Sequence, residues 1–296
     1  MKIISNFKGV FWMMVFCVFI PLGDALTRTL IETGVHVMQA IFLEYSIITL
    51  VLLPFVKIPT LSVLRADPLK KWHILRCISF FLAALFWLGV IAHVPLTQLY
   101  AIGFLAPIFA SFLSVYLLKE TLTSHKVGSL IVGLLGTFVI IRPGISEVSP
   151  FLLIALFAPL AWAFTTVSTK RLTDHYSHLG LLFIMSVTTW VLSAPFALYY
   201  WTKVPSHLWG VICVIASIGL VVHFALILAF RYAPLTVLLP LEFSTLIFAT
   251  LYGSIFFNET IDMLTYVGAL MIVGSTVYIT IKTNLKVRPV SSHLDI

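Results

Sequence analysis

Charged residues are scarce in this sequence. Asp, Glu, Lys and Arg make up 10% of its 296 residues, whereas hydrophobic residues make up 60%. Because a soluble domain needs far more charged and polar surface, this composition excludes an ordinary soluble protein. Most of the hydrophobic runs reach the roughly 20 residues with which a helix crosses a bilayer. The sequence predicts an all-α polytopic membrane protein with ten transmembrane helices, at about residues 7–26, 35–56, 72–92, 96–118, 127–141, 150–169, 179–200, 209–230, 235–257 and 264–281.

Several features of enzymes and secreted proteins are also missing. The three cysteines, Cys17, Cys77 and Cys213, fall within predicted helices at spacings that match no disulfide or metal framework. No Gly-rich phosphate loop of the Walker type is present, so direct coupling to ATP is not expected. Residues 1–8 are too short and polar for a separate signal peptide, so the first run is expected to remain as a helix. We expect no cofactor and no metal.

The net charge of +7 is unevenly distributed along the chain. If the N-terminus is cytoplasmic and ten helices follow, fifteen Lys and Arg residues, among them Arg76 and Arg231, lie on the cytoplasmic side. Only Arg28, Arg142 and Lys203 lie outside. This is the positive-inside bias of membrane proteins. It favours a multi-pass protein of the inner (plasma) membrane with both termini in the cytoplasm. The basic residues are then explained by membrane topology, and we expect a lipid bilayer and not nucleic acid as a partner.

Residues 94–121 are repeated at residues 233–260, about 139 positions later, and ten of the 28 aligned positions are identical. The repeat predicts a first domain at 1–142, a second at 143–284 and a cytoplasmic tail at 285–296. Because each domain holds five predicted helices, an odd number, the second must enter the membrane from the opposite side. Such inverted repeats place the substrate site near the bilayer midplane, between the halves.

Three shared motifs lie at the ends of the repeated helices. They are Pro-Leu-Thr at 95–97 and 234–236, Lys119-Glu120-Thr121 with Asn258-Glu259-Thr260, and Val127-Gly128 with Val267-Gly268. A further motif, Leu241-Glu242, lies inside the ninth predicted helix and has no counterpart in the first half. These motifs resemble the drug/metabolite transporter superfamily in its ten-helix form with two EamA-type repeats. Residues 36–55 are similar to the second helix of bacterial S-adenosylmethionine uptake carriers, which commonly have Arg at the position of Glu44. The resemblance implies a secondary carrier of small metabolites that works without a cofactor.

Acidic residues inside predicted helices are the first candidates for a site, because a charge at the bilayer centre costs at least about 2.5–3.5 kcal/mol. Asp24, Glu44 and Glu242 are such residues, and the other half has no acid at the equivalent positions. Glu120 and Glu259 match each other at helix ends, so we interpret both as structural. Two alternatives remain open: a salt bridge from Asp24 to Arg28, four residues on, and a protonated Glu44 that bonds a neighbouring helix.

Aromatic residues and one histidine complete the predicted site. Tyr45, Trp87, Tyr100 and Trp162 lie on helices expected to line the cavity, as do Phe86 and Phe243, and aromatic faces attract cations. His223 could bind substrate or, with Glu44 and Glu242, carry protons, although a single histidine in a helix is more often a packing residue. The predicted substrate-binding set is Asp24, Glu44, Tyr45, Trp87, Tyr100, Trp162 and Glu242.

No clear Lys or Arg inside the membrane balances these acids, so the predicted cavity favours a cationic or zwitterionic solute. Examples are an amino acid derivative, S-adenosylmethionine or a quaternary amine such as choline. We therefore expect a secondary transporter working by alternating access, with protons as a possible coupling ion and a homodimer as a possible assembly. The alternatives are an exporter of neutral amino acids or other metabolites, an intramembrane enzyme and a non-transporting membrane receptor.

Overall fold

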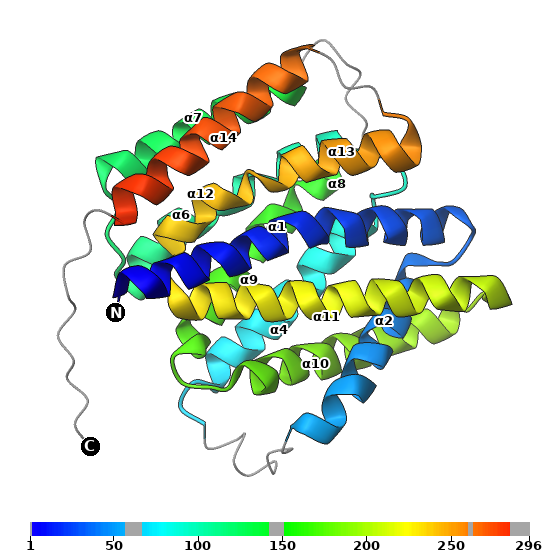
Figure 1. Ribbon diagram of the computed structural model, residues 1–296. Helices are drawn as coiled ribbons and strands as arrows, with labels where there is room; N and C mark the ends of the chain where they lie inside the picture. Colours follow the sequence, from blue (N-terminus) through cyan, green and yellow to red (C-terminus); the bar gives the residue numbers. More distant parts are fainter. Residues whose placement is uncertain (1, 57–66, 142–150, 260–262, 285–296) are drawn as a thin grey trace.

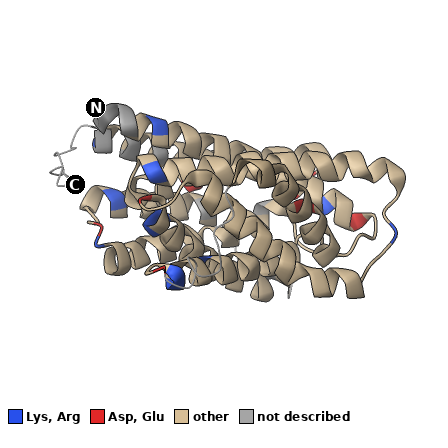
Figure 2. Ribbon diagram, turned by 90° about the horizontal axis from the view of Figure 1, so that it is seen from below, with Lys and Arg blue, Asp and Glu red and all other residues tan. Residues whose placement is uncertain are grey.

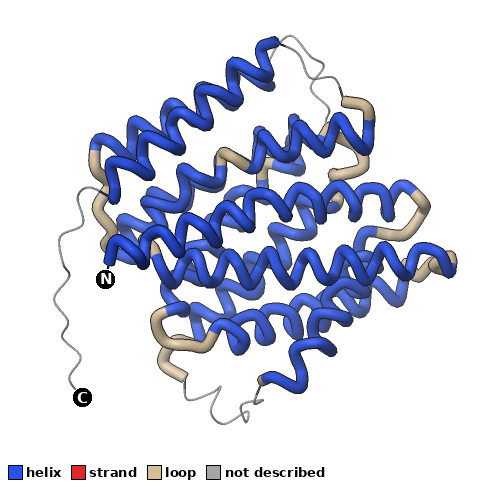
Figure 3. Tube along the Cα trace, viewed as in Figure 1, coloured by secondary structure: helices blue, strands red, loops and turns tan. Residues whose placement is uncertain are grey.

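The computed structural model describes residues 2–56, 67–141, 151–259 and 263–284, and within these ranges every regular element is helical (Figures 1 and 3). The elements are α1 (Lys2–Glu32), α2 (Val37–Leu52) with the 3₁₀ turn η1 (Leu53–Phe55), α4 (Lys70–Leu88), α5 (Leu96–Gly103), α6 (Leu105–Leu118), α7 (Ser124–Ile141), α8 (Phe151–Ala155), α9 (Phe157–Thr173), α10 (His178–Tyr199), the 3₁₀ turn η2 (Ser206–Leu208), α11 (Trp209–Tyr232), α12 (Leu235–Glu242), α13 (Thr245–Phe257) and α14 (Met263–Asn284).

Eight stretches of the described chain are long and apolar enough to cross a membrane. They coincide with eight of the ten predicted runs, while α7 and α14, which cover the other two, are not among them. This agrees with a polytopic membrane protein. The count of ten spans and the orientation of the termini stay predictions. The first predicted helix was too short, because α1 continues past residue 26 to Glu32 with Pro21 inside it.

Three predicted helices, at 96–118, 150–169 and 235–257, are each broken into two in the structure. Prolines explain the first two breaks, because proline has no N–H for the carbonyl four residues earlier. Pro107 leaves the carbonyl of Gly103 without that bond, and α5 ends at Gly103. Pro159 does the same for Ala155, where α8 ends. At the third break the hydroxyl of Thr245 donates to the carbonyl of Glu242, 2.6 Å away.

The helices of the two predicted halves pair with one another across the molecule. The most extensive contacts join α1 to α11, α2 to α10, α4 to α9 and α7 to α14. Figure 1 shows α1 and α11 running side by side along most of their length. Each of these eight helices thus packs against a helix of the other half.

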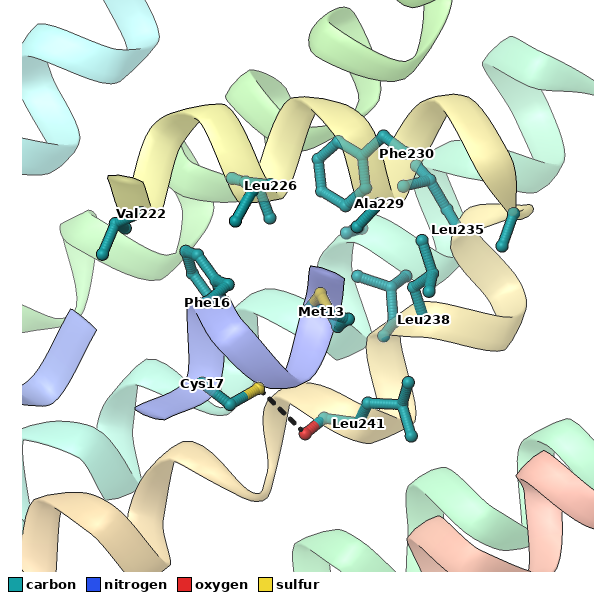
Figure 4. Packing of buried hydrophobic residues seen from close by; sticks show 14 of the residues in the cluster. Met13, Phe16, Cys17, Val222, Leu226, Ala229, Phe230, Leu235, Leu238 and Leu241 are labelled. Carbon is teal, nitrogen blue, oxygen red and sulfur yellow. Dashed lines mark hydrogen bonds between the residues drawn. The ribbon is translucent and has the colours of Figure 1, made fainter. Parts of the chain in front are cut away.

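Most Lys and Arg residues lie where α1 begins and α11 ends, which we call the basic end (Figure 2). There Lys8 lies 5.7 Å from the ring centre of Tyr232, and Lys126 donates to the hydroxyl of Thr236. A large hydrophobic cluster packs α1, α11 and α12 together between this end and the middle of the bundle, with Met13, Phe16 and Phe230 among its members (Figure 4). The opposite end, where α1 finishes and α11 begins, is the far end.

The two repeated glutamates each cap a helix of the other half. Glu120, just after α6, accepts hydrogen bonds from the backbone amides of Leu235 and Thr236 at the start of α12, at 3.1 and 3.0 Å. Glu259, just after α13, accepts from the amide of Leu96 at the start of α5, at 3.0 Å. A carboxylate at a helix N-terminus satisfies free amides and favours the helix dipole. These contacts give both glutamates the structural role that the sequence predicts.

Matching backbone turns place both glutamates. Lys119 and Asn258, one residue earlier, adopt left-handed conformations with φ of 56° and 53°. The amides of Glu120 and Glu259 then bond carbonyls six residues back, those of Ser114 and Gly253, which closes the end of each helix. The two turns are alike, so both carboxylates reach the start of a helix in the other half.

Candidate functional site

A cavity of about 1090 Å³, part of it open to solvent, lies between helices of both halves. Its lining comes from α1, α2, α4, α5, α6, α9, α11, α12 and α13. All eight residues that the sequence singles out line it: Asp24, Glu44, Tyr45, Trp87, Tyr100, Trp162, His223 and Glu242. Phe86 and Phe243 do not belong to the lining; Phe86 packs on Phe157 and Phe243 on Phe104. The roles of the eight in binding or proton coupling stay predictions.

Asp24 is held by two aromatic donors from the same half. Its Oδ2 accepts hydrogen bonds from Trp87 Nε1 at 2.8 Å and from Tyr100 Oη at 2.6 Å. The two rings meet edge to face, with centroids 5.1 Å apart. Gly103 leaves room for the indole, because a Cβ atom there would lie 2.9 Å from the Trp87 ring. The cluster fixes one carboxylate oxygen and leaves Oδ1 without a recorded bond in the described part of the chain.

The proposed pairing of Asp24 with Arg28 does not occur. Arg28 instead contacts Glu32 through Nε at 2.9 Å and Glu259 through Nη1 at 3.1 Å. Its guanidinium also lies over the ring of Phe257, 4.0 Å from the centroid. Since Arg28 is engaged at the far end, the charge of Asp24 is left for the cavity.

Glu44 lies on α2 and points at α11, where it packs on Gly219. A Cβ atom at Gly219 would come too close to Glu44 Oε1, so a larger residue there would force this carboxylate to move. Among the described residues no hydrogen bond to the Glu44 carboxylate is recorded, and the alternative of a bond to a neighbouring helix is not observed. Sequence reasoning missed Gly219, because a glycine in an apolar helix carries no sign of what it faces.

Glu242 ends α12 at the third helix break and is 6% exposed. Its Oε1 has no hydrogen-bond partner among the described residues. A buried carboxylate without a partner is costly unless it is protonated or meets a ligand. The equivalent position in the other half is Gly103. The second repeat therefore has an acid where the first repeat has a glycine that makes room for the indole of Trp87.

Five rings cover the side of the cavity nearest the basic end, and we call them the aromatic floor: Phe16, Tyr45, Phe80, Trp162 and His223. Tyr45 Oη and His223 Nε2 are 2.9 Å apart and share a hydrogen bond. Phe80 meets both of these rings edge to face, with centroids 5.8 and 5.1 Å away. Trp162 stacks on Phe16 at 6.3 Å. Tyr45 and Phe80 thus hold the His223 ring in place, and this arrangement agrees with a packing role as well as with a contact to substrate.

Arg76 corrects one sequence prediction, that no clear Lys or Arg lies inside the membrane. Its predicted place on the cytoplasmic side stays a prediction. In the structure its side chain is 1% exposed, inside the bundle, and touches α9 and α10. It lines a small crevice that shares Phe80, Trp162 and His223 with the large cavity. The one available signal was Thr165 and Thr169, two polar residues a turn apart in the sixth run.

The chain has relatives among known proteins. Residues 7–142 and 149–281 each match the pattern of the EamA-like transporter family. The chain is similar to the S-adenosylmethionine uptake transporter of Rickettsia prowazekii, with 26% identity over 272 residues that cover 92% of each protein. It is similar to the riboflavin transporter of Vibrio cholerae, with 22% identity over 92% of this chain and 93% of that protein.

Two further similarities complete the comparison. A pseudopaline exporter of Pseudomonas aeruginosa is 24% identical over 188 residues, which cover 62% of this chain and 65% of the exporter. One solved crystal structure superposes with a TM-score of 0.72 at 18% identity, over 94% of this chain and 96% of that chain. At that identity the superposition shows a shared fold.

Proposed function

This chain belongs to the EamA-like transporter family, and from that premise we propose that it carries small cationic or zwitterionic metabolites across the inner membrane by alternating access. It is a transporter, not an enzyme, and works in a membrane on a small molecule. The finer points, namely the substrate, the mechanism and the membrane, are our proposal. We place the basic end in the cytoplasm, following the positive-inside bias.

One observation carries the proposal: the large cavity is lined by three carboxylates and several aromatic rings, and no Lys or Arg is found among its described lining residues. Carboxylates stabilise a cation that leaves water, and aromatic faces add an attraction that grows as the cation is desolvated. Asp24 keeps one oxygen free, and Glu44 and Glu242 have no recorded hydrogen bond from the described protein. A bound cation would supply the missing partner.

S-adenosylmethionine is our leading substrate, since the relative with 26% identity over 92% of the chain is named for its uptake. Its sulfonium and amino groups are cations that suit an acidic, aromatic cavity. Other relatives are named for riboflavin transport and for pseudopaline export, so the family name alone sets neither the solute nor the direction. We propose uptake of a zwitterion or cation, with export of other metabolites as the alternative.

Proton coupling is a second part of the proposal. Glu44 and Glu242 line the same cavity from different halves, and His223 lies in its floor. A carboxyl that is buried in one conformation and hydrated in another can gain and lose a proton during transport. We assign this role to Glu44 and Glu242, because His223 is already bonded to Tyr45.

The test is uptake into proteoliposomes of labelled S-adenosylmethionine, choline, neutral amino acids and nucleosides, with and without a pH gradient. We expect the first two classes to be transported, and Glu44→Gln to reduce their uptake by roughly 10-fold or more. Asp174→Asn removes an exposed acid outside the cavity and is the matched control.

Three outcomes would change this proposal. Transport limited to neutral or anionic solutes, undisturbed by Glu44→Gln, would refute the cationic cavity. An identical pH dependence in wild type, Glu44→Gln and Glu242→Gln would remove proton coupling. Binding of solute without any uptake would favour a non-transporting receptor.

A further inference from the structure

Arg76 is a buried cation with neutral neighbours. Its Nε donates to Thr169 Oγ1 at 2.8 Å, Nη1 to the carbonyl of Leu181 at 2.9 Å, and Nη2 to the sulfur of Met185 at 3.5 Å. A guanidinium has five N–H donors, so these bonds, one of them to a weak thioether acceptor, leave some donors unused. No carboxylate among the described residues forms an ion pair with Arg76.

Arg28, the other arginine whose contacts were described above, differs from Arg76 in both burial and partners. Arg28 lies near the far end, keeps part of its surface exposed and has two carboxylates as partners. Arg76 is more deeply buried and has none. A charge buried without a counter-charge costs free energy, and inside a membrane protein such a group usually marks a binding site or an ion path. The hydrogen bonds that link α4 to α9 and α10 do not require a charge, because a neutral side-chain amide can donate to Thr169 Oγ1 and to the carbonyl of Leu181.

The position of Arg76 relative to the cavity supplies the second observation. The small space beside it is lined by Phe80, Trp162 and His223, which also belong to the aromatic floor. Phe80 is one helical turn beyond Arg76 on the same face of α4. Since α4 starts at the basic end, Arg76 lies on the side of the floor nearer that end. A solute that moves from the cavity toward the basic end crosses the floor and meets Arg76 next.

We propose that Arg76 is an anion subsite that binds the carboxylate of a zwitterionic substrate, while Asp24, Glu44 and Glu242 bind its cationic part across the aromatic floor. The inference rests on the proposed transport of cations and zwitterions and narrows it. Among the candidate solutes it selects molecules of the amino acid type, which carry both charges. Quaternary amines and polyamines without an acid group would leave Arg76 uncompensated and bind less tightly.

Polar groups around Arg76 suit a carboxylate. Thr169 already accepts from the guanidinium, and its hydroxyl in turn donates to the carbonyl of Thr165 at 2.7 Å. Thr165 shares a hydrogen bond with Ser79 at 2.9 Å. When a carboxylate accepts from Arg76, these hydroxyls keep their own partners. The guanidinium offers the planar, two-pronged donor geometry that a carboxylate matches.

The test uses the full chain and two pairs of probes that differ by a carboxylate and whose cationic group lies several bonds away from it: S-adenosylmethionine and its decarboxylated form, and arginine and agmatine. Binding is measured by ligand-induced thermal stabilisation in detergent, and uptake in proteoliposomes. We expect wild type to bind the carboxylated member of at least one pair roughly 10- to 100-fold more tightly. Arg76→Gln should remove that preference by weakening the carboxylated probe alone.

Two further variants complete the design. Lys71→Gln removes an exposed charge from the same helix and should leave the preference intact. Arg76→Lys keeps the charge without the planar geometry, so it should retain part of the preference, and it decides the matter if Arg76→Gln does not fold. Equal losses for both members of a pair in Arg76→Lys or Arg76→Gln, or no preference in wild type, overturn the subsite.

Binding and uptake separate this inference from the transport proposal. A chain that prefers carboxylated probes but moves none of them supports the subsite and contradicts transport. A chain that transports agmatine and decarboxylated S-adenosylmethionine as well as their carboxylated partners, with Arg76→Gln unchanged, supports the acidic cavity and overturns the subsite.

Discussion

Glu120 and Glu259 stand at equivalent places in the two repeats, and each caps a helix of the other half, yet their partners differ. At the basic end Glu120 accepts from two backbone amides, those of Leu235 and Thr236. At the far end Glu259 accepts from the amide of Leu96 and also pairs with the guanidinium of Arg28. The same scaffold contact is therefore backbone-based at one end and includes an ion pair at the other.

The two halves therefore keep a glutamate at the same position of the repeat, while the groups that this glutamate contacts differ. A side-chain substitution does not remove a backbone amide, and we expect salt to weaken a hydrogen bond to such an amide only slightly. An ion pair depends on a second side chain and weakens as salt screens it. If the two ends open alternately, as our proposal requires, they need not open with equal ease. The predictions below separate the two caps, beginning with the larger effect.

Removing the carboxylate of Glu120 should have the largest effect on stability. Glu120→Ala leaves the amides of Leu235 and Thr236 without their acceptor at the start of α12, and we expect the free energy of unfolding in detergent to fall by about 2 kcal/mol. Glu120→Gln keeps one acceptor and should lose less. Asp174→Ala, an exposed acid, should change little. An unaltered unfolding midpoint for Glu120→Ala would show that this cap does not stabilise the fold.

The Arg28–Glu259 pair should give a smaller and salt-dependent coupling. A double-mutant cycle with Arg28→Ala and Glu259→Ala should yield a coupling free energy of about 1 kcal/mol at low salt, because both side chains are only slightly exposed. The coupling should shrink in high salt, while the loss from Glu120→Ala should not. Equal salt dependence at both ends would remove the distinction between the caps.

Loop contacts extend the comparison. At the far end Gln39 and Thr202 form a neutral tie, in which Gln39 Nε2 donates to the Thr202 carbonyl at 2.8 Å and Oε1 accepts from the Thr202 amide at 3.0 Å. At the basic end Asp67 accepts from the hydroxyl of Tyr176 at 2.6 Å and from the amide of Leu69 at 2.8 Å. The first tie has no titratable group. The second has Asp67, Tyr176 and also His73, whose Nε2 lies 3.8 Å from the Asp67 carboxylate.

The smallest expected effect is a pH dependence of the Asp67–Tyr176 contact at the basic end. Partial burial opposes the charge of Asp67, but the bonds from Tyr176 and Leu69 outweigh it and lower the pKa of this carboxyl. Its contribution to stability is then complete above the unfolded pKa and is lost as the pH falls through the lower, folded value. Thermal unfolding between pH 6 and 3 should show this loss in wild type and less of it in Asp67→Asn; Gln39→Ala should leave it unchanged.

Tyr176 gives the complementary signal at alkaline pH. Burial, followed by the hydrogen bond to Asp67, raises the pKa of its phenol to about 12. Because the folded pKa exceeds the ordinary value, this contribution is present below that value and is lost as the pH rises toward 12. Absorbance titration of the phenolate in wild type and Asp67→Asn would detect a lower pKa in the variant.

Much of the site could be predicted from sequence because an acid in an apolar run stands out. Asp24, Glu44 and Glu242 were found in this way, and the structure brings them to one cavity. Arg76 was missed for the opposite reason. It lies six residues into α4, at a depth where a long basic side chain usually reaches back to the membrane surface. Only the packing of α9 and α10 around it shows that it does not.

Helix continuity shows a similar limit. Continuous hydrophobicity at 96–118 and 150–169 suggested single helices, although Pro107 and Pro159 were visible. A proline inside a membrane helix is often tolerated, so the sequence alone does not decide between a kink and a break. Gly219 could not be predicted from the sequence. Its importance comes from its contact with Glu44, which lies 175 positions away and meets it only because α2 packs on α11.

The exchanged caps also set an order of events during synthesis. Leu96 begins α5 early in translation, but its acceptor Glu259 is 163 residues further along the chain. The cap on α5 therefore forms only after the second half has been synthesised up to Glu259. A nascent chain that stalls midway would leave the amide of Leu96 without this acceptor, a feature that distinguishes an unfinished protein from a complete one.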